Sequence, residues 1–296
     1  MKRIFKDLYL IGSEITENYP MKYLTSIKIG GNAKYFIKPY DVEGYIKSLK
    51  YLNEEELSFK VVGNMSNIIP GDFYDGVLVS TNYLNSIKIC DENVYVEPGL
   101  QINSLIKVLA NRGFGGLEFL SGLPGTVGGA VYMNAGAFSG EIKDIIEEVY
   151  LSDLSGKEKI FSLEDMVFSY RNSILKEKKL FIKGVKFKII KKPKAQIYEK
   201  AKKILRRRLE KQPLNKYNSG SVFMRPFKTF YVGSTIDKLK LKGFTVGDAQ
   251  VSSKHAGFII NNKNATQLDV KILIEKIQDI IFETEGVRIK REVEFI

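Results

Sequence analysis

Hydrophobic and polar positions follow two periods along this chain, and the changes between them predict its elements. After Asp41, apolar residues recur every three or four positions, which predicts a helix with one buried face. The same spacing recurs in residues 100–113 and 266–286, whereas residues 180–190 alternate over their second half as a half-buried strand does. Further strands are predicted at residues 25–33, 35–39, 59–62, 77–79, 87–89, 94–96, 245–246 and 257–260.

Capping residues and turn residues support these boundaries. Asp41 is a suitable first cap, and Thr266 with Asp269 has the spacing of a capping box. Gly113 and Gly286 are expected to end their helices. Residues 149–151 and 159–161 predict a hairpin around the turn at residues 153–156. Strands and helices are therefore mixed along the chain, without an internal repeat.

Length and charge indicate how these elements are grouped. A chain of 296 residues is long enough for two or three domains. The basic segment around Pro193 is the clearest change in composition, and it predicts a boundary between residues 192 and 193. The full prediction is three ranges, 1–90, 91–192 and 193–296. The basic helix that follows is expected to bury one apolar stripe, Ile197, Ala201, Leu205 and Leu209.

Composition excludes several classes of protein. At 44% hydrophobic and 27% charged residues, the chain resembles an ordinary soluble globular protein. Only a short apolar run, residues 8–12, follows the basic N-terminus, so a cytoplasmic protein without a signal peptide is expected. Cys90 lies in an alternating strand pattern and is predicted to be buried. One cysteine and one histidine give no metal-ligand set.

A net charge of +12 invites a nucleic-acid-binding interpretation, which remains the alternative to an enzyme. The lysines are spread over the whole chain and alternate with acidic residues, so no single basic surface is indicated. The charge also favours small anionic substrates.

The least ordinary stretch is residues 119–140, which contain 22 residues without a charge, six of them glycine. Pro124 and Asn134 make it too polar for a membrane span. Its glycine spacing matches neither the dinucleotide-binding nor the phosphate-loop motif. A packed turn is the ordinary interpretation. The functional one is that the backbone approaches a flat, anionic ligand.

Five further segments carry candidate chemistry. The turn at residues 63–67 follows a strand and can hold a pyrophosphate, or it is a plain turn. Arg171 is suited to a carboxylate substrate, or to a surface ion pair. Ser221 is suited to proton delivery, or to satisfying its own turn. Glu292 is a candidate of the same kind, or an exposed residue of the last strand. His255 is ordinarily a structural residue or one that supports a site residue.

Residues 121–130, continuing through 133–137, resemble the flavin-binding signature of the UDP-N-acetylenolpyruvoylglucosamine reductases. Six more motifs match that family in order. They are residues 25–33, Tyr170-Arg171, residues 220–226, residues 247–252, residues 255–261 and Glu292-Val293. The resemblance covers nearly the whole chain, and the short spacing between residues 226 and 247 resembles the shorter form of the family.

The resemblance implies an α+β fold: a two-lobed FAD-binding region of the vanillyl-alcohol-oxidase type and a C-terminal α+β substrate-binding domain. It implies bound FAD, NADPH as reductant, and UDP-N-acetylglucosamine enolpyruvate as the substrate. The enzyme is expected to be a monomer that binds no metal, membrane or nucleic acid. A flavin oxidase on the same scaffold is the rival enzyme. The implied catalytic residues are Arg171, Ser221 and Glu292, and the implied substrate-binding residues are Tyr170, Arg225, Gln250 and His255. The implied cofactor-binding residues are Gly63, Asn64, Met65, Ser66, Asn67, Ser121, Gly122, Gly125, Thr126, Gly128, Gly129, Ala130, Asn134, Ala135 and Gly136.

Met65 departs from the family pattern, which has a glycine at this position of the loop. If the position needs a positive φ, Met65 is strained, and otherwise the loop has another shape. Substitution of Met65 by glycine is therefore expected to be tolerated and to tighten FAD binding.

Overall fold

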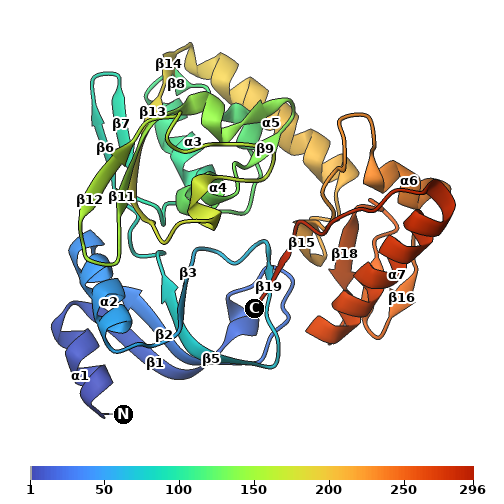
Figure 1. Ribbon diagram of the computed structural model, residues 1–296. Coiled ribbons are helices and arrows are strands. Elements are labelled where there is room, and N and C mark those ends of the chain that lie inside the picture. Colours follow the sequence, from blue (N-terminus) through green and yellow to red (C-terminus); the bar gives the residue numbers. More distant parts are fainter. Residues whose placement is uncertain (1) are drawn as a thin grey trace. The chain divides into compact units, whose positions relative to one another are not determined.

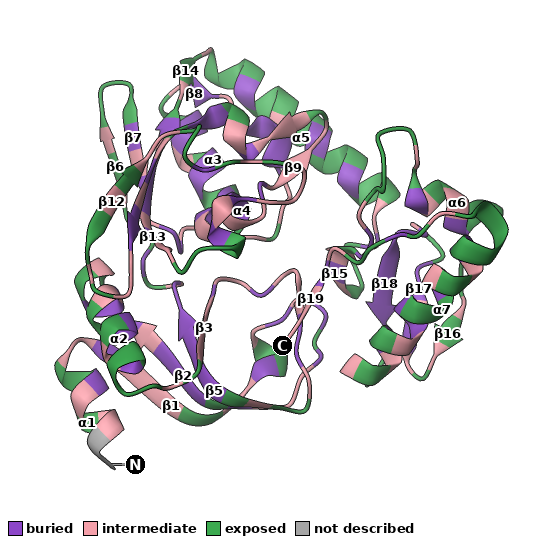
Figure 2. Cartoon of the chain, in the orientation of Figure 1, coloured by how far each residue is buried: buried purple, intermediate pink, exposed green. Residues whose placement is uncertain are grey.

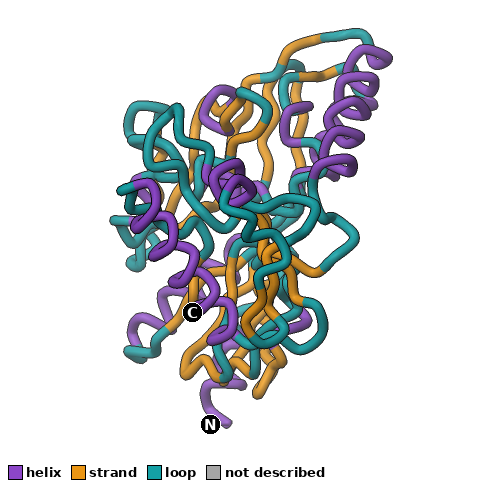
Figure 3. Tube along the Cα trace, turned by 90° about the vertical axis from the view of Figure 1, so that its right-hand side faces the viewer, coloured by secondary structure: helices purple, strands orange, loops and turns teal. Residues whose placement is uncertain are grey.

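The computed structural model describes residues 2–296, with side chains from residue 4 onward, and mixes helices and strands (Figures 1 and 3). The chain divides into two compact units. The first unit contains the residues up to Glu17, Tyr35–Asn64 and Asp75–Arg206. The second contains Asn18–Lys34, Met65–Tyr74 and Arg207–Ile296. Two short N-terminal segments therefore belong to the unit that holds the C-terminus.

A four-stranded sheet of order β1-β2-β5-β3 is formed early in the chain. Its strands are β1 (Ser13–Pro20), β2 (Asn32–Pro39), β3 (Phe59–Val62) and β5 (Phe73–Ser80), with β3 and β5 parallel. α1 (Lys2–Leu10) precedes this sheet, and α2 (Val42–Glu54) joins β2 to β3. The Asp41 side chain accepts a 2.7 Å hydrogen bond from Gly44 N–H, which confirms the predicted cap.

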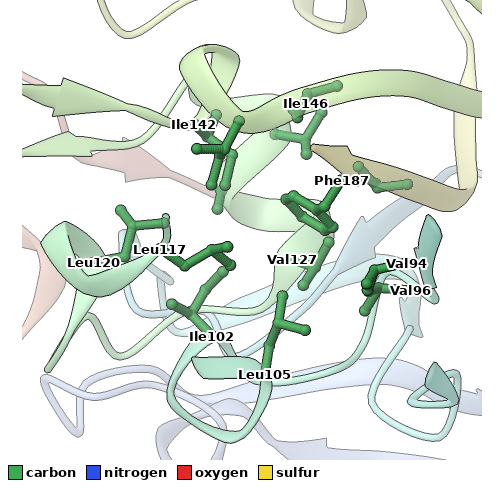
Figure 4. Packing of buried hydrophobic residues seen from close by; sticks show 14 of the residues in the cluster. Val94, Val96, Ile102, Leu105, Leu117, Leu120, Val127, Ile142, Ile146 and Phe187 are labelled. Carbon is green, nitrogen blue, oxygen red and sulfur yellow. The ribbon is translucent and has the colours of Figure 1, made fainter. Parts of the chain in front are cut away.

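The second sheet has the order β12-β11-β13-β7-β6, and all its neighbouring strands are antiparallel. Its strands are β6 (Ile87–Cys90), β7 (Asn93–Val96), β11 (Ile146–Ser152), β12 (Glu158–Phe161) and β13 (Phe181–Lys188). The predicted hairpin is β11 and β12. α3 (Ile102–Asn111) and α4 (Val127–Tyr132) contribute to the core on this sheet, where Ile102, Val127 and Phe187 pack together (Figure 4).

The first unit has two hydrophobic cores. One is formed by buried residues between Leu8 and Leu84, the other by residues between Val94 and Ile204. Two short strand pairs complete this unit, β8 (Phe114–Gly115) with β14 (Ile190–Lys191) and β9 (Gly136–Ala137) with β10 (Gly140–Glu141).

The second unit contains an antiparallel sheet of order β15-β18-β17-β16. Its strands are β15 (Tyr217–Ser221), β16 (Thr245–Val246), β17 (Ala249–Val251) and β18 (Phe258–Asn261), with helices α6 (Val232–Lys238) and α7 (Gln267–Glu285). α7 begins with the predicted capping box of Thr266 and Asp269 and ends at Gly286, whose φ is 68°. The last strand, β19 (Glu294–Phe295), pairs in parallel with β4 (Ile68–Ile69).

The predicted buried stripe of the basic helix is confirmed at Ile197 and wrong at Leu205 and Leu209. In α5 (Lys194–Lys211), Leu205 and Leu209 are 41% and 53% exposed, whereas Ile204 and Arg208 are buried together with Ile197 (Figure 2). The helical repeat allows either set of positions to face inward, and the packing of Ile204 into the first unit's core selects the second set. Arg208 is 7% exposed, and its Nη1 donates a hydrogen bond to Gln212 Oε1 at 3.4 Å.

Two smaller predictions are also wrong. Cys90 is exposed because it is the last residue of β6, paired with Asn93 at the turn into β7. Residues 25–31 form a loop instead of a strand, since β2 begins only at Asn32. The predicted division into three contiguous ranges remains a prediction for the folding units of this chain.

Candidate active site

The glycine-rich stretch forms turns that lead into the short helix α4. Thr126 caps α4, and its Oγ1 accepts from Gly129 N–H at 3.3 Å. Gly122 has a φ of 81°, and its N–H donates to Asn103 Oδ1 at 2.7 Å. Gly128 N–H donates to Pro98 O at 2.8 Å. The stretch is therefore held by side-chain and backbone groups of its own unit.

The first unit has two features that fit a bound FAD. A Cβ on Gly63 would overlap the Thr126 hydroxyl, so only glycine lets these segments meet. The Ser121 Oγ is buried without a hydrogen-bond partner within the described residues. A buried hydroxyl without a partner costs free energy, and a cofactor oxygen would remove that cost. The residues present thus fit the cofactor that the sequence predicts.

The other predicted cofactor residues of this stretch lie within or next to α4. Ala130 is buried and Gly125 accepts from Ile102 N–H through its carbonyl at 3.0 Å. Ala135 N–H donates to Ala130 O at 2.8 Å, and Gly136 begins β9. Asn134 is completely buried, and its side chain binds protein groups (Glu141 and Ser169).

Met65 lies in the loop of residues 63–67 with a φ of 44° and is 3% exposed. The first of the two alternatives is therefore right, because this position does have a positive φ that a glycine adopts without strain. The side chain is nevertheless buried, so it contributes apolar contact that glycine would not. Gly63 and Asn64 belong to the first unit, and Met65, Ser66 and Asn67 to the second.

Arg171 lies at the tip of a tight turn in the first unit. Ser169 and Asn172 exchange two backbone hydrogen bonds of 3.1 Å, and Arg171 between them has a φ of 56°. A positive φ is rare for a residue with a side chain and is characteristic of the third residue of a type II turn. Arg171 Nη2 donates to Gly136 O at 3.1 Å, and its guanidinium lies 5.2 Å from the ring of Tyr170. Backbone strain at this position is typical of a functional residue.

Ser221 lies at the end of β15 in the second unit. The register of β15 against β18 shifts between Asn218 and Ser221, and Gly220 between them has a φ of 81°. Such a bulge redirects side chains, and Ser221 is exposed. Asn218 stabilises the turn by accepting from Gly220 N–H at 2.9 Å. Val222 and Phe223, which follow, are buried in this unit's core.

The segment of Glu292 lies beside the turn of Ser221. Glu292 N–H donates to Val222 O at 2.6 Å. The Asn67 side chain donates to Glu292 O at 3.1 Å, and Glu294 N–H donates to Asn67 O at 2.9 Å. Three segments far apart in sequence therefore meet in the second unit, which brings Ser221, Glu292 and Asn67 together.

His255 belongs to the same neighbourhood. A Cβ built on Gly257 would lie 3.3 Å from His255 Nδ1 and 3.7 Å from Ser221 Oγ. His255 Nδ1 accepts from Gly257 N–H at 3.1 Å, which leaves the ring hydrogen on Nε2. Burial lowers the pKa of His255 below its ordinary value of 6.5, and the positive charge of Lys242 lowers it further. The imidazole is therefore neutral at physiological pH.

The two remaining substrate-binding predictions lie elsewhere in the second unit. Gln250 Nε2 donates to Gly243 O at 3.2 Å and to Thr245 Oγ1 at 3.1 Å. Arg225 is exposed, with its guanidinium 5.5 Å from the ring of Tyr231.

Sequence reasoning missed the polar residues that hold these segments. Ser26 Oγ donates to Asn218 O at 2.7 Å and lies 3.4 Å from Ser66 O. Asn103 holds Gly122 and also donates to Leu123 O at 3.0 Å. Their signal in sequence is only that of small polar residues near turns, which many loops share.

Two absences apply to the part of the chain that the structure describes. It contains no helix long and apolar enough to cross a membrane. In the same residues, no three histidine, cysteine, aspartate or glutamate side chains are grouped to hold a metal ion.

Comparison with known proteins agrees with these features. The model described as an FAD binding domain matches residues 33–162, and a solved structure, Physcomitrella patens BBE-like 1, shares the fold over 64% of this chain with a TM-score of 0.50 and 15% identity. The chain is thus an FAD-binding oxidoreductase with the α+β fold of the vanillyl-alcohol-oxidase type.

The C-terminal region identifies the family. Residues 212–296 match the model described as the UDP-N-acetylenolpyruvoylglucosamine reductase C-terminal domain. The protein of that name from Thermosipho melanesiensis is 43% identical to this chain over 99% of this chain and 99% of its own length. The one from Thermotoga maritima is also 43% identical, over 91% of this chain and 94% of its own length. The crystal structure of the reductase from Thermus caldophilus has a TM-score of 0.80 at 29% identity, covering 96% of this chain and 98% of its own. The chain belongs to the UDP-N-acetylenolpyruvoylglucosamine reductase family.

Proposed function

We propose that this protein reduces UDP-N-acetylglucosamine enolpyruvate to UDP-N-acetylmuramate with NADPH, in the cytoplasmic synthesis of peptidoglycan precursors. Family membership over nearly the full length supports this substrate. FAD, which the glycine-rich stretch with Ser121 would hold, would supply the hydride-transfer chemistry between NADPH and C3 of the enolpyruvyl group.

The protein's own groups then have two tasks. Addition at C3 creates negative charge at C2, next to the substrate carboxylate, and C2 must also receive a proton. Arg171 is proposed to stabilise the charge through its planar guanidinium. Its strained turn and its hydrogen bond to Gly136 O, in the glycine-rich stretch, support this role.

Ser221 is proposed to donate the proton to C2, and Glu292 to orient the donor or the substrate carboxylate by hydrogen bonding. The single observation that supports this best is the backbone pairing of the two segments, with Glu292 N–H 2.6 Å from Val222 O. The neutral His255 close to Ser221 is proposed to donate a hydrogen bond to the substrate, with Tyr170, Arg225 and Gln250 binding its other polar groups.

Rapid-mixing kinetics on the purified holoenzyme test this function. NADPH should bleach the flavin absorbance under anaerobic conditions, and the enolpyruvyl sugar should restore it. Restoration by molecular oxygen but not by the sugar would favour a flavin oxidase instead. A colourless protein whose binding to DNA falls steeply with salt would favour the nucleic-acid alternative.

A further inference from the structure

The side chain of Asn134 connects the glycine-rich stretch to the turn of Arg171. Its Nδ2 donates to Ser169 O at 2.9 Å and to Glu141 Oε2 at 3.0 Å. Its Oδ1 accepts from Lys143 N–H at 3.3 Å. Only this orientation of the amide satisfies all three groups, because the first two partners accept and the third donates.

These contacts leave Asn134 little capacity for a ligand. Both hydrogens of Nδ2 are used, and the residue is 0% exposed. Its φ is 42°, a left-handed conformation that asparagine tolerates better than most residues. The backbone conformation and the side-chain bonds therefore both explain an asparagine here without a cofactor contact.

Two more bonds tie the same turn to the same stretch. Ser173 Oγ donates to Tyr132 O at 2.8 Å, just after the turn. Arg171 Nη2 itself donates to Gly136 O at 3.1 Å. The beginning, the tip and the end of the turn are thus each attached to residues 132–136.

We propose that Asn134 is a positioning residue, which holds Arg171 in register with the glycine-rich stretch, and that it does not bind the flavin. This inference rests on the proposed role of Arg171 in the reaction. A misplacement of about 1 Å of a catalytic group can slow a reaction by about 10²-fold. Loss of one of three attachments should slow the step that needs Arg171 by about 10- to 100-fold.

Asn134→Gly is the cleanest variant, because glycine adopts a φ of 42° without strain while the amide is removed. The variant should retain FAD and be reduced by NADPH at the normal rate, but its reoxidation by the enolpyruvyl sugar should be slow. In an Arg171→Ala background the same substitution should cause no further slowing, since both changes remove one function. Additive effects, loss of FAD, or unchanged reoxidation would each overturn the proposal.

Asn103→Ala provides the matched contrast, because Asn103 holds Gly122 and Leu123 in the same stretch with the same chemistry. It should weaken FAD retention several-fold and leave the reoxidation rate of the FAD-loaded protein unchanged. Slowed reoxidation to the same extent as in Asn134→Gly would show that any loosening of the stretch has this effect, and would overturn the specific role of Asn134.

Amide hydrogen exchange supplies a measurement independent of turnover. Asn134→Gly should accelerate exchange at the Ser169 and Asn172 amides, which the turn's own bonds protect. Unchanged exchange at these two amides would overturn the proposal. If the parent protein does not react with the enolpyruvyl sugar, that result counts against the proposed function alone, and the exchange measurement still tests the role of Asn134. If Asn134→Gly does not fold, Ser173→Ala removes a second attachment and must give the same pattern more weakly.

Discussion

The two units hold their candidate functional groups in different ways. In the first unit, the glycine-rich stretch and the turn of Arg171 lie within 50 or so positions of one another, and glycines and positive φ angles shape them. In the second, Ser221, Glu292 and Asn67 meet through hydrogen bonds between distant segments, such as the bond that joins Asn67 to Glu292, 225 positions away.

This difference separates two kinds of sensitivity to mutation. The glycine-rich stretch and the turn of Arg171 are most sensitive to changes of local conformation, because a side chain added at a close contact displaces the backbone. The residues of the second unit are most sensitive to loss of a long-range hydrogen bond, because each of these bonds also joins two distant parts of the chain. Five substitutions, taken from the largest expected effect to the smallest, test the contrast.

Ser221→Ala should give the largest effect. Loss of a positioned general acid should slow flavin reoxidation by the enolpyruvyl sugar by about 10²–10⁴-fold, with reduction by NADPH close to normal. Ser221→Cys should recover part of the rate. Ser219→Ala is the control, because the buried Ser219 Oγ has no hydrogen-bond partner in the described residues and its removal should cost little. Fast reoxidation of Ser221→Ala in a stopped-flow experiment would exclude Ser221 as the proton donor.

Arg171→Ala should retain FAD and slow the same step by about 10²–10³-fold, the effect of losing one group that stabilises transition-state charge. Arg112→Ala, an exposed arginine at the end of α3, is the control and should have a normal rate. A near-normal rate of Arg171→Ala at saturating substrate would show that Arg171 has only a structural role.

Asn67→Ala should loosen the segment of Glu292, because the bond to Glu292 O is lost while the backbone pairing of Asn67 O remains. We expect about 10-fold slower reoxidation and a free energy of unfolding lower by about 1–2 kcal/mol. Asn85→Ala, in an exposed turn, should leave both unchanged. Urea denaturation and stopped-flow kinetics measure the two quantities, and a change in neither would contradict the long-range coupling.

Met65→Gly balances two terms that the sequence alone could not compare. Removing the positive φ strain should stabilise the loop by about 1–2 kcal/mol. Losing a buried methionine should cost about 2–3 kcal/mol, so the net effect on the free energy of unfolding is a loss of about 1 kcal/mol, while tighter FAD binding remains the expectation from the family pattern. Tighter FAD binding together with higher thermal stability would show that the strain term dominates.

His255 should add a small pH dependence to the stability of the second unit. Because the pKa of His255 is lowered in the folded state, the unfolded chain binds more protons than the folded chain below pH 6.5. The contribution of His255 to stability is therefore present above that pH and is lost as the pH falls. The free energy of unfolding of His255→Gln should therefore decline less between pH 7 and 5 than that of the parent. Equal declines in urea titrations would mean that burial does not shift this pKa.

Much of the first group could be predicted from the sequence. Residues 121–137 and Tyr170-Arg171 are contiguous motifs, and the helix caps at Asp41 and Thr266 depend on neighbouring residues alone. What could not be predicted is which neighbours they contact. Asn134 matched a flavin signature, yet its amide binds Ser169 and Glu141.

By itself, the sequence determined the alternation of helices and strands, the family, and the residue types available for chemistry, because these depend on local periodicity and on ordered motifs. The tertiary structure alone decided which face of α5 is buried, that the segment of Glu292 pairs with the Ser221 turn, and that residues 18–34 and 65–74 belong to the unit of the C-terminus. The physical reason is that burial and long-range hydrogen bonds depend on which surfaces meet, and the helical repeat of α5 is compatible with more than one such surface.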